Sequence, residues 1–255
     1  MADTVLVERR DEVAIITLNL PRKRNALGVE LVAALSRVLT DIQDDRSVHA
    51  LVLTGGTHFC VGGDLGGLHL PILEMRRSML VGHRMIRALV GGRLPAVAAV
   101  EGNAYGAGFS LALACDFVVA DDKASFCAAF GKVNLVPDYG LMWTLTQRVG
   151  MGRMREIVML CEAIPGSKAY EWGLVDRLSE PGKVLDGAIE LAQRLVRQPT
   201  GSMAATKAAL ARLPLNLDTL LAWEADTQAV LSQSGDFLEA VQAFAEKRPP
   251  NFAGT

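Results

Sequence analysis

The sequence predicts an α/β protein, with a layered core over residues 1–198 and a helical region over residues 199–255. In the first part, short apolar segments alternate with glycine-rich turns and helical segments, which is typical of α/β layers. After about Pro199, three helical segments follow one another with no strand-like segment between them. Half of the residues are apolar, so a chain of 255 residues can bury a substantial core.

The chain begins with a predicted hairpin. Residues 5–9 and 13–19 are rich in β-branched residues, and Arg10-Asp11-Glu12 separates them as a turn. A basic loop over residues 20–28 follows the hairpin. Apolar residues at helical spacing then predict a helix over residues 29–44, namely Leu31, Ala34, Leu35, Val38, Leu39 and Ile42.

The rest of the core repeats the order of strand, loop and helix. The predicted strands cover residues 50–54, 96–100 and 117–120, and the predicted helices cover about 71–90, 109–115 and a segment from near Gly140. In the last region, helices are predicted at residues 202–213, 217–232 and 236–247. The middle helix of this region has an apolar face, and its partner is either the core or another subunit.

Composition excludes several classes of protein. The net charge of −2 gives no broad basic surface for nucleic acid, and charged or glycine clusters interrupt every apolar run before it reaches the length of a membrane span. The four cysteines have no paired spacing, and the four histidines form no zinc-like pattern. The first residues lack a basic stretch followed by an apolar one. We therefore expect a cytoplasmic protein with no metal, no nucleic-acid partner and no membrane partner.

Two glycine-rich turns, at residues 59–65 and 102–108, each follow an apolar strand. Glycine lets the backbone approach a ligand closely, and a helix start leaves N–H groups free. Two converging N–H donors would form an oxyanion hole, which stabilises a carbonyl that becomes an anion. A purely structural turn is the alternative. A dinucleotide-binding turn is excluded because Leu111 replaces its third glycine, and a phosphate loop is excluded because Val133 follows Gly131-Lys132.

Asp138 is the acid with the most informative surroundings. It lies in the apolar segment Leu135-Val136-Pro137-Asp138, just before a predicted helix. An aspartate here could cap the helix, which would lower its pKa, or act as a base in an apolar pocket, which would raise its pKa. The spacing leaves both readings open. His83, on the helix before the second glycine turn, is a further candidate for an accessory base.

Five segments together resemble the enoyl-CoA hydratase/isomerase family, also called the crotonase superfamily. The resemblance covers nearly the whole chain. The segments are Asn19 to Leu27, Phe59 to Leu65, Gly102 to Asp116, Ala169 to Val175 and Phe244 to Phe252.

The resemblance implies a crotonase-like spiral of ββα units with a C-terminal helical trimerisation region, assembled as a homotrimer or a dimer of trimers. It implies an acyl-CoA thioester as substrate, so that CoA is part of the substrate and not a cofactor. The backbone N–H groups of Gly63 and Ala107 would hold the thioester oxygen. The residues implied to bind the substrate are Lys23, Arg24, Ala26 and Leu65 along CoA, Lys247 from the same or a neighbouring subunit, and Phe130, Val133 and Pro137 around the acyl group.

The sequence departs from the hydratases of this family at two places. Where those enzymes carry glutamates, this chain has Ser110 and Phe130, and neither can deliver a proton at neutral pH. Asp138 stands in a context that resembles isomerase branches, above all the epoxyphenylacetyl-CoA isomerase group. The expected activity is therefore a shift of a double bond through a thioester enolate, with Asp138 as the one base.

Three alternatives remain at this point. The first is residual hydratase activity. The second is hydrolytic chemistry like that of the aryl-CoA dehalogenases, which use an aspartate at the place of Asp138 and a histidine at the place of His83 but a tryptophan at the place of Phe130. The third is a non-catalytic homologue that only binds acyl-CoA.

Overall fold

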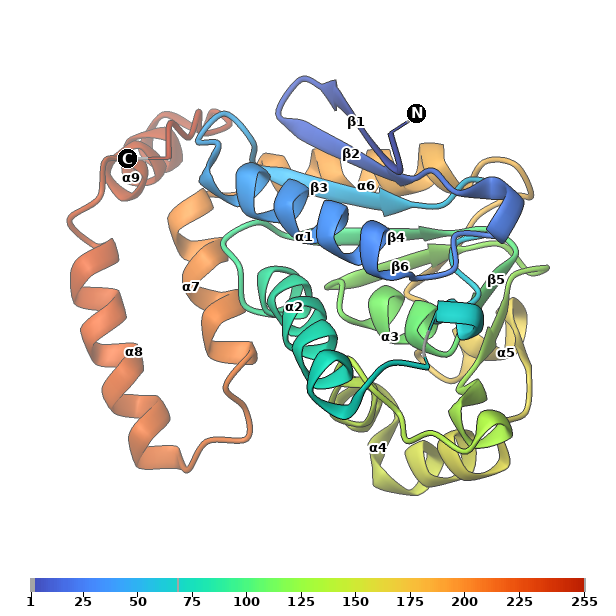
Figure 1. The fold of residues 1–255 in the computed structure, drawn as a ribbon. Coiled ribbons are helices and arrows are strands. Elements are labelled where there is room, and N and C mark those ends of the chain that lie inside the picture. Colours follow the sequence, from blue (N-terminus) through green and yellow to red (C-terminus); the bar gives the residue numbers. More distant parts are fainter. Residues whose placement is uncertain (1–2, 68, 255) are drawn as a thin grey trace.

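The computed structural model describes residues 3–67 and 69–254. Its main sheet has the strand order β1-β2-β3-β4-β6-β9, and every neighbouring pair is parallel except β1 and β2 (Figure 1). The strands are β1 (Val5–Arg10), β2 (Val13–Leu18), β3 (Ala50–Thr54), β4 (Ala96–Val100), β6 (Phe117–Ala120) and β9 (Arg177–Leu178). A small second sheet has the order β5-β7-β8, made of β5 (Asn103–Tyr105), β7 (Ser125–Cys127) and β8 (Ile164–Pro165).

Helices cover both faces of the main sheet. On one face lie α1 (Val29–Asp44) and α3 (Ala107–Leu113), with α2 (Ile72–Val90) packed against α1; on the other lies α6 (Val184–Val196) (Figure 1). Alternate strand residues enter the two cores: Ala14 and Leu51 face α1, whereas Ile15 and Val52 face α6. Because both faces are buried, the parallel strands read as continuous apolar runs.

The predicted fold class is confirmed, and so are the hairpin, the three predicted core strands and the helix over residues 29–44. Helix α3 begins at Ala107, two residues before the predicted start, because Gly106 with a φ of 50° turns the chain directly into the helix. Helix α4 (Leu141–Leu160) is interrupted at Gly150, whose φ and ψ are 73° and 166°. Helix α5 (Gly166–Glu171), helix α6 and the second sheet are not among the elements predicted from local patterns.

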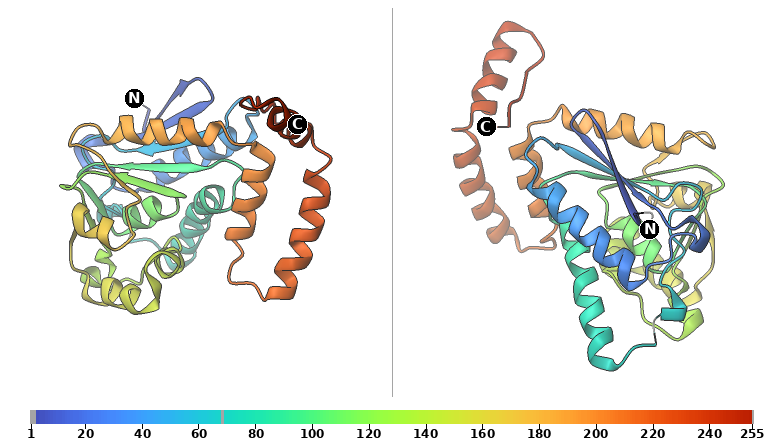
Figure 2. Two further views of the ribbon diagram at one scale, coloured as in Figure 1. Left: turned by 180° about the vertical axis from the view of Figure 1, so that it is seen from behind. Right: turned by 45° about the horizontal axis from the view of Figure 1, so that its top comes forward.

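Three helices form the last region, as predicted: α7 (Thr200–Leu210), α8 (Leu217–Leu231) and α9 (Gly235–Glu246). Lys207 connects α7 to the core, since its buried ammonium group donates to the carbonyl of Leu94 at 2.6 Å and to the carboxylate of Asp116. Helix α8 stands away from the core and has no buried residue within its described span (Figure 2). The domain boundary at residues 198 and 199 stays a prediction.

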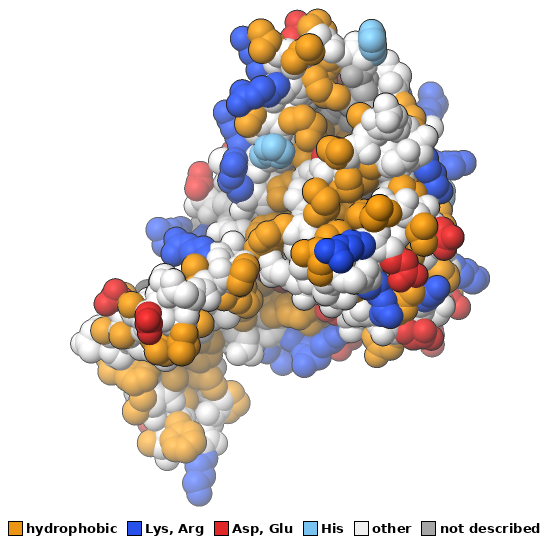
Figure 3. All heavy atoms as spheres, turned by 90° about the horizontal axis from the view of Figure 1, so that it is seen from below, with side chains coloured by type: hydrophobic (Ala, Val, Ile, Leu, Met, Phe, Trp, Pro, Cys, Tyr) orange, Lys and Arg blue, Asp and Glu red, His pale blue; other side chains and the backbone are white. Residues whose placement is uncertain are grey.

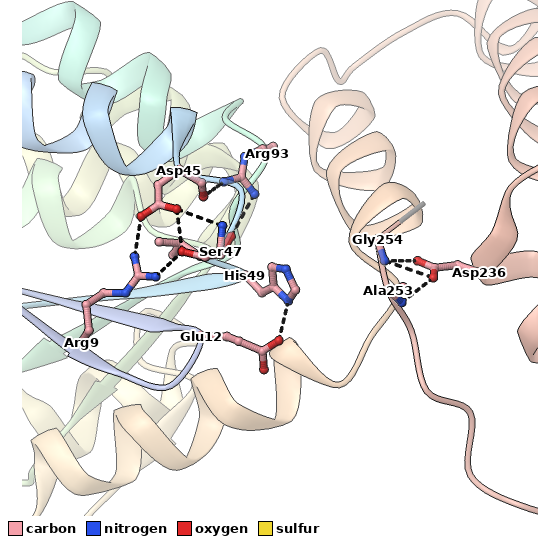
Figure 4. Close-up of polar contacts among 10 residues, drawn as sticks. Arg9, Glu12, Asp45, Ser47, His49, Arg93, Asp236, Ala253 and Gly254 are labelled. Carbon is pink, nitrogen blue, oxygen red and sulfur yellow. Dashed lines mark hydrogen bonds and ion pairs between the residues drawn. The ribbon is translucent and has the colours of Figure 1, made fainter.

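Polar contacts hold the amino-terminal ends of β3 and β4. The guanidinium of Arg93 donates to the backbone carbonyl of Asp45, whose carboxylate pairs with Arg9 at 2.9 Å (Figure 4). In the last region, the carboxylate of Asp236 accepts the N–H groups of Ala253 and Gly254, so the tail folds back on α9. Both clusters lie away from the glycine-rich turns, which follow the carboxyl ends of the strands. Among the helices of the described ranges, none is both long enough and apolar enough to cross a membrane.

Candidate active site

The two glycine-rich turns leave the same edge of the main sheet. Strands β3 and β4 are parallel neighbours, with Thr54 opposite Ala99, so their carboxyl ends lie side by side. Ligands of open α/β sheets bind outside this edge. The turns after β3 and β4 are therefore positioned by two adjacent strands.

The turns also bind to each other. The N–H of Cys60 donates to the carbonyl of Asn103 at 3.0 Å, and the N–H of Tyr105 donates to the carbonyl of Cys60 at 2.9 Å. A Cβ atom at Gly62, where φ is 103°, would lie 3.0 Å from the carbonyl oxygen of Tyr105, and one at Gly108 would lie 2.2 Å from that of Cys60. Glycine is thus required at both positions for the close approach of the turns.

The N–H groups of Gly63 and Ala107 lie just after two touching glycines. A Cβ atom at Gly106 would be only 3.7 Å from the Cα of Gly62. Ala107 is the first residue of α3, so its N–H has no acceptor within the helix. Among residues 3–67 and 69–254, no protein acceptor takes either N–H. These two donors are available to an oxygen atom of a ligand.

Asp138 lies beside the first turn with its carboxyl group largely buried. Its Oδ1 atom is inaccessible to solvent and has no hydrogen-bond partner among the described residues. Burial raises the pKa of Asp138 to about 7, and this effect exceeds the lowering by its own backbone N–H. The charge of Asp138 in turn contributes to the raised pKa values of Cys60 and Tyr139, after the larger effect of burial, so the three side chains are neighbours.

The helix-cap interpretation of Asp138 is wrong. Helix α4 has Gly140 as its N-cap, and no side chain donates or accepts at that cap. Tyr139 and Gly140 have φ values of 48° and 76°, which turn the chain and move the helix start beyond Asp138. The carboxyl group therefore accepts none of the N–H groups at the start of α4 that would lower its pKa further.

Among the described residues, no second acid replaces the missing glutamates at this site. Ser110 is fully buried, and its hydroxyl donates to the carbonyl of Gly106 at 3.3 Å. Phe130 is also buried, in the 3-10 helix η3 (Ala129–Val133). No charged group contributes to the shifted pKa of Asp138. The arrangement can therefore perform proton transfer with one carboxyl group, but it offers no pair of carboxylates to orient water.

The basic loop before α1 lies against the first glycine turn. The N–H of Leu27 donates to the carbonyl of Gly62 at 2.7 Å, and the carbonyl of Arg24 accepts the N–H of Val61 at 3.2 Å. The ammonium group of Lys23 lies 2.7 Å from the carboxylate of Asp64. Ala26 is buried in this loop, whereas the side chains of Arg24 and Leu65 are exposed.

The structure brings most of the predicted site residues to this edge of the sheet, with one exception. Val133 is exposed in η3 and Pro137 is half-buried just before Asp138. The ring of His83 meets that of Tyr139 edge to face, with 6.3 Å between the ring centroids. Lys247 ends α9, on the far side of the chain from β5 (Figures 1 and 2). Within one chain, Lys247 does not join the other residues.

Asn25 is a structural residue of the site that the sequence analysis did not single out. It is buried, its amide NH₂ donates to the carbonyls of Gly55, His58 and Phe59, and its amide oxygen accepts the N–H of Leu20. These bonds fix the basic loop to the segment that leads into the first glycine turn. Nothing in the local sequence marks this role, because asparagine is common in polar loops.

Replacing Asn25 with Ala should lower the free energy of unfolding by about 2 to 4 kcal/mol, since buried carbonyls lose their donors and Ala disfavours the left-handed φ of 58° at this position. Urea unfolding of both proteins measures this difference. The control is Asn19→Ala, which removes one exposed bond to the carbonyl of Asp3 and should change the value by less than about 0.5 kcal/mol. Equal effects of the two changes would contradict the buried role of Asn25.

The raised pKa of Asp138 predicts an unusual dependence of stability on pH. Its ordinary pKa of 3.8 applies to the unfolded chain and about 7 to the folded one, so ionisation opposes folding. The wild type should lose up to about 4 kcal/mol of unfolding free energy between pH 4 and pH 7 through this group. Asp138→Asn should escape this loss, being more stable above pH 7 and equal below pH 4. Denaturant unfolding of both proteins across this pH range measures the difference in unfolding free energy. A difference that does not change with pH would contradict the burial of the carboxyl group.

The sequence model of the family "Enoyl-CoA hydratase/isomerase" matches residues 8–255. The chain belongs to this family, and its fold is the crotonase fold.

Its relatives include both isomerases and hydratases. The chain is 34% identical to the 1,2-epoxyphenylacetyl-CoA isomerase of Escherichia coli K12, over 100% of each protein. It is 38% identical to a protein of Rhodobacter capsulatus described as a probable enoyl-CoA hydratase, over 98% of each. The crystal structure of an enoyl-CoA hydratase from Bacillus anthracis superposes with a TM-score of 0.94, at 28% identity, covering 99% of this chain and 100% of that one.

Proposed function

We propose that this protein is an acyl-CoA isomerase that moves a double bond through a thioester enolate. In this mechanism, the Asp138 carboxylate removes a proton from the carbon next to the thioester carbonyl, which leaves an enolate conjugated with the double bond. The N–H groups of Gly63 and Ala107 bind the thioester oxygen as it becomes an enolate oxygen. Asp138 then returns the proton to a different carbon, so the bond shifts and the enzyme ends unchanged.

The observation that carries this proposal is the state of the Asp138 carboxyl group. It is buried, its Oδ1 has no partner in the described chain, and burial raises its pKa to about 7. A base of this pKa is about half ionised at neutral pH, and it is strong enough to take a proton made acidic by a thioester. A surface aspartate would be ionised but a much weaker base.

The absence of a glutamate pair favours isomerisation over hydration. Ser110 and Phe130 occupy the two places, and both are buried in the core. One named relative over the full length of the chain is an isomerase, which supports the same choice. The other relatives named hydratases leave hydration as an outcome for experiment to decide.

Substrate binding follows the positions of the remaining residues. We propose that Lys23, Arg24 and Ala26 of the basic loop lie along CoA together with Leu65 of the first glycine turn, because the loop is bonded to that turn. Phe130, Val133 and Pro137 would surround the acyl group near Asp138. Lys247 lies far from them within one chain, so its proposed contact with CoA phosphates requires a neighbouring subunit.

We propose a homotrimer, or a dimer of trimers, because Lys247 lies far from the other proposed CoA-binding residues of its own chain and because α8 exposes apolar side chains. Helix α8 exposes Leu217, Leu221 and Val230, and no described residue of this helix is buried. A helix with such side chains gains stability by packing on another surface. Light scattering of the purified protein measures the mass that tests this assembly.

The test of the proposed function is NMR of a 3-enoyl-CoA substrate incubated with the protein in heavy water. Isomerisation gives the 2-enoyl isomer, with deuterium entering at the carbons that exchange protons. Formation of a hydroxyacyl-CoA would show hydration instead, and release of halide from a halobenzoyl-CoA would show dehalogenase chemistry. Binding of acyl-CoA with no turnover and no exchange across a panel of substrates would identify a binding protein.

A further inference from the structure

The turn directly after Asp138 has an unusual backbone conformation. Tyr139 has a φ of 48°, in the left-handed region that large side chains rarely adopt, and Gly140 follows with a φ of 76°. Such a conformation costs free energy at a tyrosine, so it persists only where surrounding contacts hold it. The tyrosine side chain is only 6% exposed and belongs to the main hydrophobic core. Its packing is therefore a contact that can hold the turn.

The ring of Tyr139 packs directly on the backbone of α2 at Gly82. A Cβ atom at Gly82 would lie 2.3 Å from Cε1, 2.5 Å from Oη and 2.6 Å from Cζ of Tyr139. The neighbouring His83 ring meets the tyrosine edge to face, with an angle of 83° between the ring planes. A side chain at position 82 would therefore have to displace the tyrosine ring.

The first residues of α4 do not provide a second anchor for this turn. Met142 and Trp143 are 47% and 38% exposed. Hydrophobic side chains gather on the molecular surface at the end where α4 lies (Figure 3). Leu141 is buried, but it already belongs to the helix. Tyr139 thus provides the buried side chain of the turn itself.

The conformation of the turn determines what surrounds the Asp138 carboxyl group. Because α4 begins after Gly140, no side chain caps the helix. The titratable groups nearby are Cys60 of the first glycine turn and Tyr139, with His83 of α2 beside the tyrosine ring. No charged group of the described chain contributes to the raised pKa of Asp138, which burial causes. A relaxed turn would let the carboxyl group reach water or the helix N–H groups, which favour its ionised form.

We propose that Tyr139 is a positioning residue that holds the Asp138 carboxyl group in place for proton transfer, and that Gly82 provides the room that its ring requires. This inference rests on the proposed function, which assigns Asp138 as the base. The ring fixes the turn to α2, and the turn keeps the carboxyl group beside the first glycine turn. Tyr139 and Gly82 therefore act on the reaction through Asp138.

The test compares Gly82→Ala with the matched control Gly152→Ala, the same change in α4 at a position where no atom lies within 4 Å of an added Cβ. Carbon NMR of the aspartate carboxyl groups, without substrate, follows the titration of Asp138, and kinetics with a 3-enoyl-CoA gives kcat and KM. Gly82→Ala should titrate at least about one pH unit below the wild type, because its carboxyl group is less buried. Its kcat should fall about tenfold while KM stays within about threefold. Gly152→Ala should match the wild type in all three quantities.

Changes at Tyr139 test the same contact from the other side. Tyr139→Phe keeps the ring and should titrate as the wild type does. Tyr139→Leu removes the part of the ring that meets Gly82, so it should show the shift expected of Gly82→Ala, and it serves as the test if Gly82→Ala does not fold. Adding Gly82→Ala to Tyr139→Leu should cause no further shift, because the ring that the new methyl group would displace is gone.

An Asp138 titration that is unchanged in Gly82→Ala and Tyr139→Leu would overturn this inference. So would an equal shift in Tyr139→Phe and Tyr139→Leu, or additive shifts in the double variant. Because the titration is measured without substrate, it separates this inference from the proposed function. The expected shifts in a protein whose wild type moves no double bond would contradict the proposed function and leave the positioning of Asp138 standing. Normal isomerisation with an unmoved titration would overturn the role of Tyr139 alone.

Discussion

Replacing Asp138 with Asn is expected to lower kcat for isomerisation by about a hundredfold to ten-thousandfold, the range that a general base contributes. The amide has the same shape as the carboxyl group but cannot accept the substrate proton. Because Oδ1 of Asp138 has no partner among the described residues, the change costs this atom no hydrogen bond there. The affinity for acyl-CoA should therefore stay close to that of the wild type. Stopped-flow kinetics and calorimetry measure the two quantities.

The matched control for this variant is Asp122→Asn, the same chemical change at an exposed acid after β6. Its kcat should equal that of the wild type. A fully active Asp138→Asn protein would show that another group takes the proton, and the assignment of Asp138 as the base would then be wrong. Loss of activity in both variants would point to a general effect of charge on the protein.

Replacing Gly108 with Ala should have the second largest effect, lowering kcat by about a hundredfold to a thousandfold. The added Cβ would lie 2.2 Å from the carbonyl oxygen of Cys60. Both atoms belong to the backbone or are fixed to it, so the clash is relieved only if one of the two segments shifts. The change pushes α3 and the first glycine turn apart, which separates the N–H groups of Gly63 and Ala107. The enolate oxygen then loses one of its two donors.

The control for Gly108→Ala is Gly152→Ala, at a position in α4 where no atom lies within 4 Å of an added Cβ. This change should leave kcat unaltered and raise the free energy of unfolding by about 0.5 to 1 kcal/mol, since Ala favours a helix more than Gly does. Rates are compared per folded molecule, with folding checked by circular dichroism. Normal kcat in Gly108→Ala would mean that the spacing of the two turns does not matter for the reaction.

The main features of the fold were predictable because they depend on local patterns. Strands β3 and β4 are buried on both faces, so each reads as an apolar run between turns. The strands of the second sheet have only two or three residues and are defined by pairing with distant segments, which no local pattern contains. Helix α6 is a different case, because Val184, Ala188 and Leu191 repeat at helical spacing and the pattern was present in the sequence.

The site was predictable where the backbone alone defines it. Two glycine-rich turns after parallel strands must meet at one edge of the sheet, and the structure places them there. The environment of Asp138 was not predictable, since it depends on where α4 begins and on which groups surround the carboxyl. The two positive φ values after Asp138 determine where α4 begins. Burial near Cys60 and Tyr139 determines the surroundings of the carboxyl group. The role of Asn25 depends on contacts with segments distant in the sequence.

Titration of the Asp138 carboxyl group itself is the most direct test of this account. Carbon NMR of protein labelled at the aspartate carboxyl carbons, compared with Asp138→Asn, identifies its signal. If Asp138 is the buried base, this signal titrates near pH 7, and kcat/KM rises about tenfold per pH unit below this point and levels above it. A signal that titrates near the ordinary value of 3.8, with a rate that does not change between pH 5 and pH 8, would contradict it.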